Sequence, residues 1–173
     1  MKNKYLYLLV LSNVMIILDQ VTKFLVATKI PLYYSIEVIH GLLNITHVRN
    51  PGVAFGLFAN QELEYKALIF VVVSAVAAVA ILVIFYQSPE AKIMANTGLI
   101  LIFSGAVGNM IDRVVHKEVI DFVDIYFRNF HWPAFNVADS CITIGVTLMI
   151  IDLFKHHPGG ETPSDSPEKQ THL

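Results

Sequence analysis

Four long apolar segments constrain the fold of this chain more than any other feature of its sequence. The second, residues 67–86, contains no charged side chain and has the length, about 20 residues, that an α-helix needs to cross the core of a bilayer. The third and fourth cover about residues 93–111 and 137–154, and the first runs from about residue 5 to 18 and continues toward Pro31. The sequence therefore predicts an all-α membrane protein built as a bundle of four transmembrane helices.

The composition agrees with this class. Hydrophobic residues make up 55% of the chain and charged residues only 15%, whereas a soluble domain carries about 25% charge. A net charge of −2 gives no electrostatic footprint for nucleic acid, so we expect no nucleic-acid partner. The single cysteine, Cys141, excludes an intrachain disulfide and a thiolate metal cage, and its place inside the last apolar segment predicts an inert buried thiol.

The chain divides into a membrane domain and a short tail. We assign residues 1–155 to one four-helix domain, and residues 156–173, rich in Pro, Gly, Ser and Glu, to a disordered polar cytoplasmic tail. Lys2 and Lys4 before an apolar stretch resemble the start of a signal peptide. No small-residue cleavage site follows, so we expect the first helix to be retained.

The number of crossings places the polar ends of the helices together. Counting Lys and Arg on the two sides does not decide the orientation, but the lysines before the first helix place the N-terminus in the cytoplasm. The first and third segments then end, and the fourth begins, at one extracytoplasmic face. Polar residues in such positions are costly and are functional candidates by default. The candidates are Asp19, Lys23, Asn109, Arg113, Asp121, Asn136 and Asp139.

Structural interpretations of these residues stay open at the sequence level. Asp19 and Lys23 are spaced i,i+4, as in an ion pair on a helix surface. For Arg113, the alternative to a functional role is an anchor at the lipid headgroups. Asn136 and Asp139 have the spacing of a capping-box variant at a helix start.

The residue types present favour an aspartic mechanism. The seven histidines are dispersed and form no His-Glu-x-x-His run, and no serine stands in a nucleophile-elbow context, so we expect no metal and no cofactor. Asp121, unless it is an ordinary loop acid near Asp124, can pair with Asp139 so that one protonated and one ionised carboxyl activate water. A small proton-coupled carrier or channel is the alternative, although it would prefer ionisable residues in the middle of the helices. An assembly scaffold would leave the clustering unexplained.

The segments outside the helices carry two further signals. Residues 36–50 contain β-branched residues in partial alternation, which predicts short strands, and Asn50-Pro51-Gly52 suits a type II turn. The connection before the fourth segment carries an aromatic set of the kind found at membrane interfaces. Its members are Tyr126, Phe127, Phe130, Trp132 and Phe135.

Five motifs follow one another along the chain, namely residues 19–23, 50–56, 105–113, 119–122 and 133–140. They resemble those of the lipoprotein signal peptidases, the type II signal peptidases of bacteria, over about residues 15–154. The resemblance implies an aspartic endopeptidase of the bacterial cytoplasmic membrane with a small extracytoplasmic β-platform and a short helix. Such an enzyme is a hydrolase of lipoprotein maturation that cuts a prolipoprotein before its diacylglyceryl-modified cysteine.

The resemblance also implies roles for single residues. The catalytic pair falls on Asp121 and Asp139, and Asp112 is expected to be structural. We expect a monomer that contacts the lipidated prolipoprotein and membrane lipid, with its active site at the extracytoplasmic face. The expected supporting and substrate-binding residues are Asp19, Lys23, Asn50, Asn109, Arg113 and Asn136.

Overall fold

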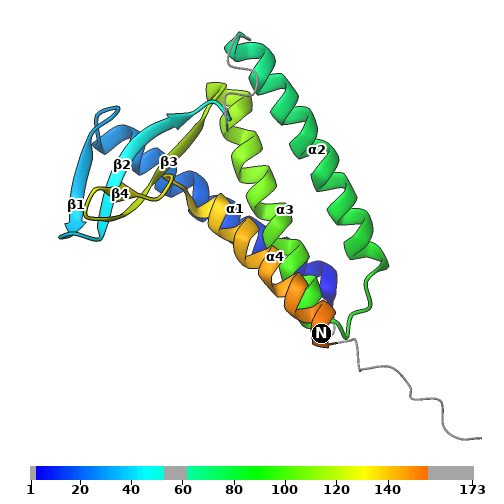
Figure 1. The fold of residues 1–173 in the computed structure, drawn as a ribbon. Helices are drawn as coiled ribbons and strands as arrows, with labels where there is room; N and C mark the ends of the chain where they lie inside the picture. The colour runs from blue at the N-terminus through cyan, green and yellow to red at the C-terminus, as the bar shows by residue number, and fades with distance from the viewer. Residues whose placement is uncertain (1–2, 53–61, 156–173) are drawn as a thin grey trace, which may run out of the picture.

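Four long helices form the body of the molecule (Figure 1). The computed structural model describes residues 3–52 and 62–155, so the predicted tail and residues 53–56 of one motif lie outside the described residues. Each of the four helices is long and apolar enough to cross a membrane, which confirms the predicted bundle. The short helix implied by the resemblance is not among the elements of the described residues. The helices are α1 (Lys4–Lys29), α2 (Leu63–Gln87), α3 (Ile93–His116) and α4 (Val137–Lys155).

A four-stranded antiparallel sheet lies at one end of the bundle, with its strands in the order β1-β2-β3-β4. The strands predicted within residues 36–50 are confirmed, and the positive φ of +81° at Gly52 agrees with the predicted turn. Strand β3 (Val119–Phe127) was not predicted, and it pairs with β2 across a long separation in sequence. The strands are β1 (Ser35–Ile39), β2 (Leu43–Asn50), β3 (Val119–Phe127) and β4 (Phe130–His131).

The central helix is α3, which packs against the other three helices. It lies especially close to α4, because a Cβ on Gly98 would be 2.7 Å from the carbonyl oxygen of Gly145, and a Cβ on Gly145 would be 2.6 Å from that of Gly98. Two glycines at this contact let the helix backbones approach closely, as small residues do in membrane helices. Cys141 of α4 is buried, as predicted.

The outermost helix is α2, which packs along α3 and meets α1 at its C-terminal end. Its C-terminal carbonyl groups are held by Lys4 at the start of α1. The Lys4 ammonium donates to the carbonyl oxygens of Phe85, Tyr86 and Ser88 at 3.1, 3.0 and 2.8 Å. A cation at the negative end of a helix is favourable, so this contact fixes α2 against α1 at the end far from the sheet.

Candidate active site

A lysine buried beside two carboxylates organises the polar end of the bundle. Lys23 of α1 is only 1% exposed, and its Nζ lies 2.8 Å from Asp19 Oδ2 and 3.0 Å from Asp112 Oδ2. It also donates to Asn109 Oδ1 at 3.0 Å. The i,i+4 ion pair expected from the sequence is therefore present, but its placement on a helix surface was wrong. An ion removed from water needs such partners, because desolvation costs several kcal/mol.

The two carboxylates also hold the backbone next to both candidate catalytic residues. Asp19 Oδ1 accepts the N–H of Ala138 at 2.9 Å, directly before Asp139. Asp112 Oδ2 accepts the N–H of Ile120 at 3.1 Å, directly before Asp121. The ion cluster thus fixes the start of α4 and the start of β3 against α1 and α3.

Close packing and one amide complete this cluster. A Cβ on Gly108 would lie 2.6 Å from Asp19 Oδ2, so a glycine leaves the room that this carboxylate occupies. The Gln20 amide nitrogen donates at 3.1 Å both to Asp19 Oδ2 and to Asp112 Oδ1. Gln20 belongs to the first motif, but no role could be assigned to it from the sequence, because its partner Asp112 is on another helix.

A reciprocal capping box begins α4. Asn136 Oδ1 accepts the N–H of Asp139 at 2.9 Å, and Asp139 Oδ2 accepts the N–H of Asn136 at 3.2 Å. The structural interpretation of this pair is therefore confirmed. The capping box uses only Oδ2 of the Asp139 carboxylate. Asp139 is partly exposed, and its Oδ1 accepts a further hydrogen bond from Asn109 Nδ2 at 2.8 Å.

Asp121 lies in β3 and is 2% exposed, so its interpretation as an ordinary loop acid was wrong. Its Oδ1 accepts from Asn136 Nδ2 at 2.7 Å and its Oδ2 from Asn50 Nδ2 at 2.9 Å. Asn50 reaches it from β2, where it pairs with Val119 of β3, so it is a diagonal neighbour on the same face. The sheet thus supplies one of the two aspartates and one of its donors.

Burial raises the pKa of Asp121 from 3.8 to about 6. The hydrogen bond from Asn50 lowers this pKa, the nearby charge of Asp139 raises it, and the hydrogen bond from Asn136 lowers it again. A carboxyl in such surroundings holds its proton closer to neutral pH than an exposed aspartate does.

Two asparagines join the aspartates into one network. Asn136 contacts both, through its side chain to Asp121 and through the capping box to Asp139. Asn109 Oδ1 accepts from Asn136 Nδ2 at 3.2 Å as well as from Lys23. The predicted convergence of polar residues at one end of the bundle is therefore found in the structure.

Arg113 lies beside this network. Its Nη1 donates to the carbonyl oxygen of Asn109 at 3.3 Å, and its guanidinium lies 5.0 Å from the ring centre of Phe70. Its Nε is buried and has no hydrogen-bond partner within the described ranges 3–52 and 62–155. In the part of the chain that the structure describes, the guanidinium is thus directed toward Asn109 and Phe70.

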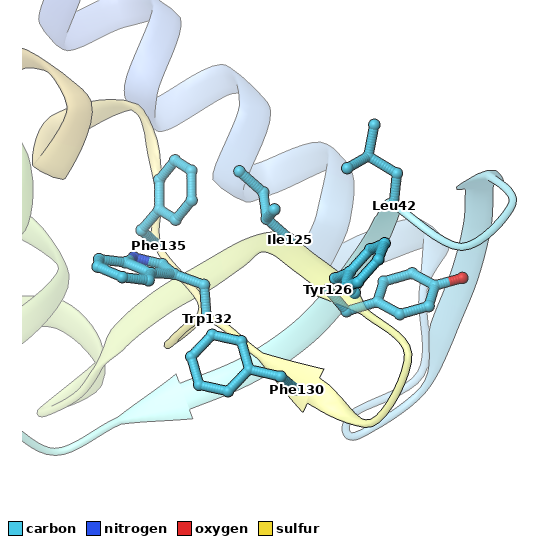
Figure 2. A pocket seen from close by; sticks show the side chains of 7 residues that line it. Leu42, Ile125, Tyr126, Phe130, Trp132 and Phe135 are labelled. Carbon is cyan, nitrogen blue, oxygen red and sulfur yellow. The ribbon is translucent and has the colours of Figure 1, made fainter.

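Two neighbouring cavities open at this end of the molecule, and Asp139 lines one of them. One, of about 670 Å³, is lined by Asp139 and Asn50 and extends along α4 to Ile144. The other, of about 440 Å³, lies on the sheet and is lined by the predicted aromatic set together with Leu42 and Ile125 (Figure 2). Trp132 and Phe135 border both cavities, so the polar site continues into an apolar aromatic surface.

The family model described as signal peptidase (SPase) II matches residues 11–155. The chain belongs to the signal peptidase II family. It is therefore a peptidase, which displaces the carrier, channel and scaffold interpretations.

Relatives within the signal peptidase II family cover most of the chain. The lipoprotein signal peptidase of Desulforapulum autotrophicum is 48% identical over 143 residues, which are 83% of this chain and 88% of the relative. That of Geobacter metallireducens is 45% identical over 155 residues, 90% of this chain and 94% of the relative. A bacterial membrane enzyme solved by the in meso method at 1.9 Å resolution has a TM-score of 0.76 and 37% identity, with coverage of 87% of this chain and 94% of that chain.

The pH dependence of stability tests the environment of Asp121 in this signal peptidase II. Because its folded-state pKa is raised, the stabilising contribution of the proton is present below about pH 4 and is lost as the pH rises through about 6. Relative to Asp121→Asn, which does not titrate, the wild type should lose on the order of 3 kcal/mol of unfolding free energy between about pH 4 and pH 8. Unfolding of both proteins in detergent measures this difference, and a difference that does not change with pH would contradict it.

Proposed function

We propose that Asp121 and Asp139 are the catalytic pair with which this signal peptidase II removes the signal peptide of a prolipoprotein. The observation that carries the proposal is the asparagine shared by the two carboxyls. Asn136 donates to Asp121 at 2.7 Å and exchanges capping hydrogen bonds with Asp139, which lines a cavity of about 670 Å³. The pair is thereby held as a unit at the wall of a space that can admit a peptide.

The surroundings of the two aspartates differ. Asp121 is the more buried, and its raised pKa of about 6 makes it the member that holds the shared proton. Asp139 lies in the first turn of α4 and lines the cavity. We therefore assign Asp121 as the acid and Asp139 as the base of an aspartic mechanism.

Hydrolysis then proceeds without a covalent enzyme intermediate. Asp139 takes a proton from water as the water oxygen attacks the scissile carbonyl carbon, and Asp121 gives its proton to the carbonyl oxygen. The tetrahedral diol collapses when Asp139 returns a proton to the leaving amine and the C–N bond breaks. Asp121 recovers its proton from the diol, which leaves the new carboxyl group on the signal peptide.

The remaining candidates support this chemistry in two ways. Asp19, Lys23 and Asn109 hold the positions of the catalytic elements through the buried ion cluster, while Asn50 and Asn136 orient the carboxyls. Arg113 is the candidate for substrate binding, because its guanidinium lies next to Asn109, the partner of Asp139, and its planar fork suits a peptide carbonyl.

Asparagine variants test the pair directly. Asp121→Asn and Asp139→Asn should each insert and fold but lose at least about 99% of the cleavage rate, and the double variant should be no worse than either single one because the residues act as a unit. Cleavage of a lipidated precursor by purified protein, followed by gel shift, measures this. Asp124→Asn is the matched control, since Asp124 is a buried acid of the same strand that pairs with His131. Retention of more than a few per cent of activity in either single variant would defeat the assignment.

We further propose that the substrate is the diacylglyceryl-modified prolipoprotein, cut before the lipidated cysteine. The aspartates lie at the end of an apolar bundle, so a peptide bond can reach them while acyl chains stay in the bilayer. Each methylene buried in lipid contributes about 0.8 kcal/mol, so the acyl chains can supply much of the binding.

Lipid dependence is expected from this arrangement. A precursor without the diacylglyceryl group should show a much lower kcat/KM than the modified form, because the acyl chains hold the bond at the depth of the aspartates. Parallel time courses with both precursors in the same detergent or lipid mixture measure the ratio. Equal rates would argue against a lipid-dependent substrate while leaving the aspartate pair untouched.

The orientation in the bacterial cytoplasmic membrane completes the proposal. Lys2 and Lys4 favour a cytoplasmic N-terminus, so the ends of α1 and α3, the start of α4 and the sheet lie on the extracytoplasmic side. We propose that both termini are cytoplasmic, that the active site faces the extracytoplasmic side, and that the enzyme is a monomer.

Cysteine labelling in intact cells reports this orientation. Arg128→Cys, at an exposed position between β3 and β4, should react with an impermeant thiol reagent, whereas Glu90→Cys between α2 and α3 should react only after lysis. The native Cys141 is buried and should stay unlabelled in the folded protein. The reverse pattern for the two introduced cysteines would overturn the orientation.

A further inference from the structure

One aromatic ring connects the outermost helix to the proposed catalytic network. Most side chains of α2 face outward, and the helix packs mainly along α3. Phe70, about two turns from its start, is half-buried and turned toward the site. It contacts residues on two separate chains of interaction, and each chain ends at a different aspartate.

The first chain of interactions runs through Arg113. The Arg113 guanidinium carbon lies 5.0 Å from the centre of the Phe70 ring, a distance at which the ring attracts the cation. Arg113 Nη1 donates to the carbonyl oxygen of Asn109, and Asn109 Nδ2 donates to Asp139 at 2.8 Å. The ring therefore holds the guanidinium against the helix turn that carries the partner of Asp139.

The second chain of interactions runs through Gly52. Its φ is +81°, and a Cβ on it would lie 2.8 Å from Phe70 Cδ2, so the ring packs directly on this turn. The N–H of Gly52 donates to Asn50 Oδ1 at 2.8 Å, and Asn50 Nδ2 donates to Asp121 at 2.9 Å. The same ring thus supports the turn that places the donor of Asp121.

We propose that Phe70 is a positioning residue for the catalytic pair, which it supports through Arg113 on one side and through the Asn50–Gly52 turn on the other. The inference rests on the proposed function of Asp121 and Asp139. A ring that only fills space between α2 and α3 would need no cation on its face and no glycine against its edge. Phe70 has both.

Replacement of the ring tests the proposal at its simplest. Phe70→Leu keeps an apolar side chain but removes the aromatic face, so kcat for the lipidated precursor should fall roughly tenfold, and KM should rise because Arg113, the candidate for substrate binding, loses its support. Phe85→Leu is the matched control, because Phe85 is on the same helix and its ring also lies near a cation, Lys4 Nζ at 5.3 Å. That variant should lower stability and leave the turnover of the folded enzyme near the wild-type value. Turnover of Phe70→Leu equal to wild type would overturn the proposal.

A fluorination series separates the cation contact from packing. Phenylalanines with one, two and three ring fluorines at position 70 keep the shape of the ring almost unchanged but weaken its attraction for a cation step by step. The wild-type fold is then retained even if Phe70→Leu does not fold, and kcat should decline progressively along the series. A flat series would show that the ring acts only by packing and would refute its role through Arg113. Activity in Asp121→Asn or Asp139→Asn, in contrast, would defeat the proposed function itself, whatever the result at Phe70.

Discussion

The ammonium group of Lys23 is the constraint on which the polar end of this molecule depends. Asp19 and Asp112 approach it at 2.8 and 3.0 Å in surroundings where neither carboxylate would be stable as an isolated charge. Loss of the lysine would leave two buried like charges unpaired. While paired with the lysine, each carboxylate also accepts a hydrogen bond from a backbone N–H. Asp19 accepts that of Ala138, and Asp112 accepts that of Ile120.

These contacts of Asp19 and Asp112 explain how a small bundle can fix the positions of two aspartates relative to each other. The catalytic candidates are on a helix and on a strand that share no local sequence. Each of them follows directly a residue whose N–H is held by the ion cluster, so an error in the placement of one element is limited by contacts to α1 and α3. Asn109 and Asn136 then orient the carboxyl groups of the two aspartates, since each fully hydrogen-bonded member of a buried network restricts the others.

Much of this arrangement could be predicted because it is local in sequence. The helices follow from the lengths of apolar segments, and the capping box from the spacing of Asn136 and Asp139. Because successive helices cross the membrane in opposite directions, the order of the segments alone predicts that the polar helix ends lie on one side. These predictions use only the residue types and their separation along the chain.

Other features depend on neighbours that are distant in sequence. Strand β3 begins with Val119 to Phe122, all buried, and this continuous run does not alternate as a half-exposed strand would. Gln20 and Phe70 are ordinary residues for their helices, and only the approach of α3 and of the Gly52 turn gives them partners. The ion pair of Asp19 and Lys23 was predicted correctly. Its burial could not be predicted, because it depends on Asp112 of another helix.

The capping box has a directional consequence for proton transfer. The backbone N–H of Asn136 and the amide of Asn109 already donate to the two oxygens of Asp139. In the proposed mechanism, a proton taken from water would occupy a lone pair of Asp139 that these two donors leave vacant. The start of α4 would act in this way as a stereochemical guide, because it restricts the directions from which this carboxylate can accept a proton.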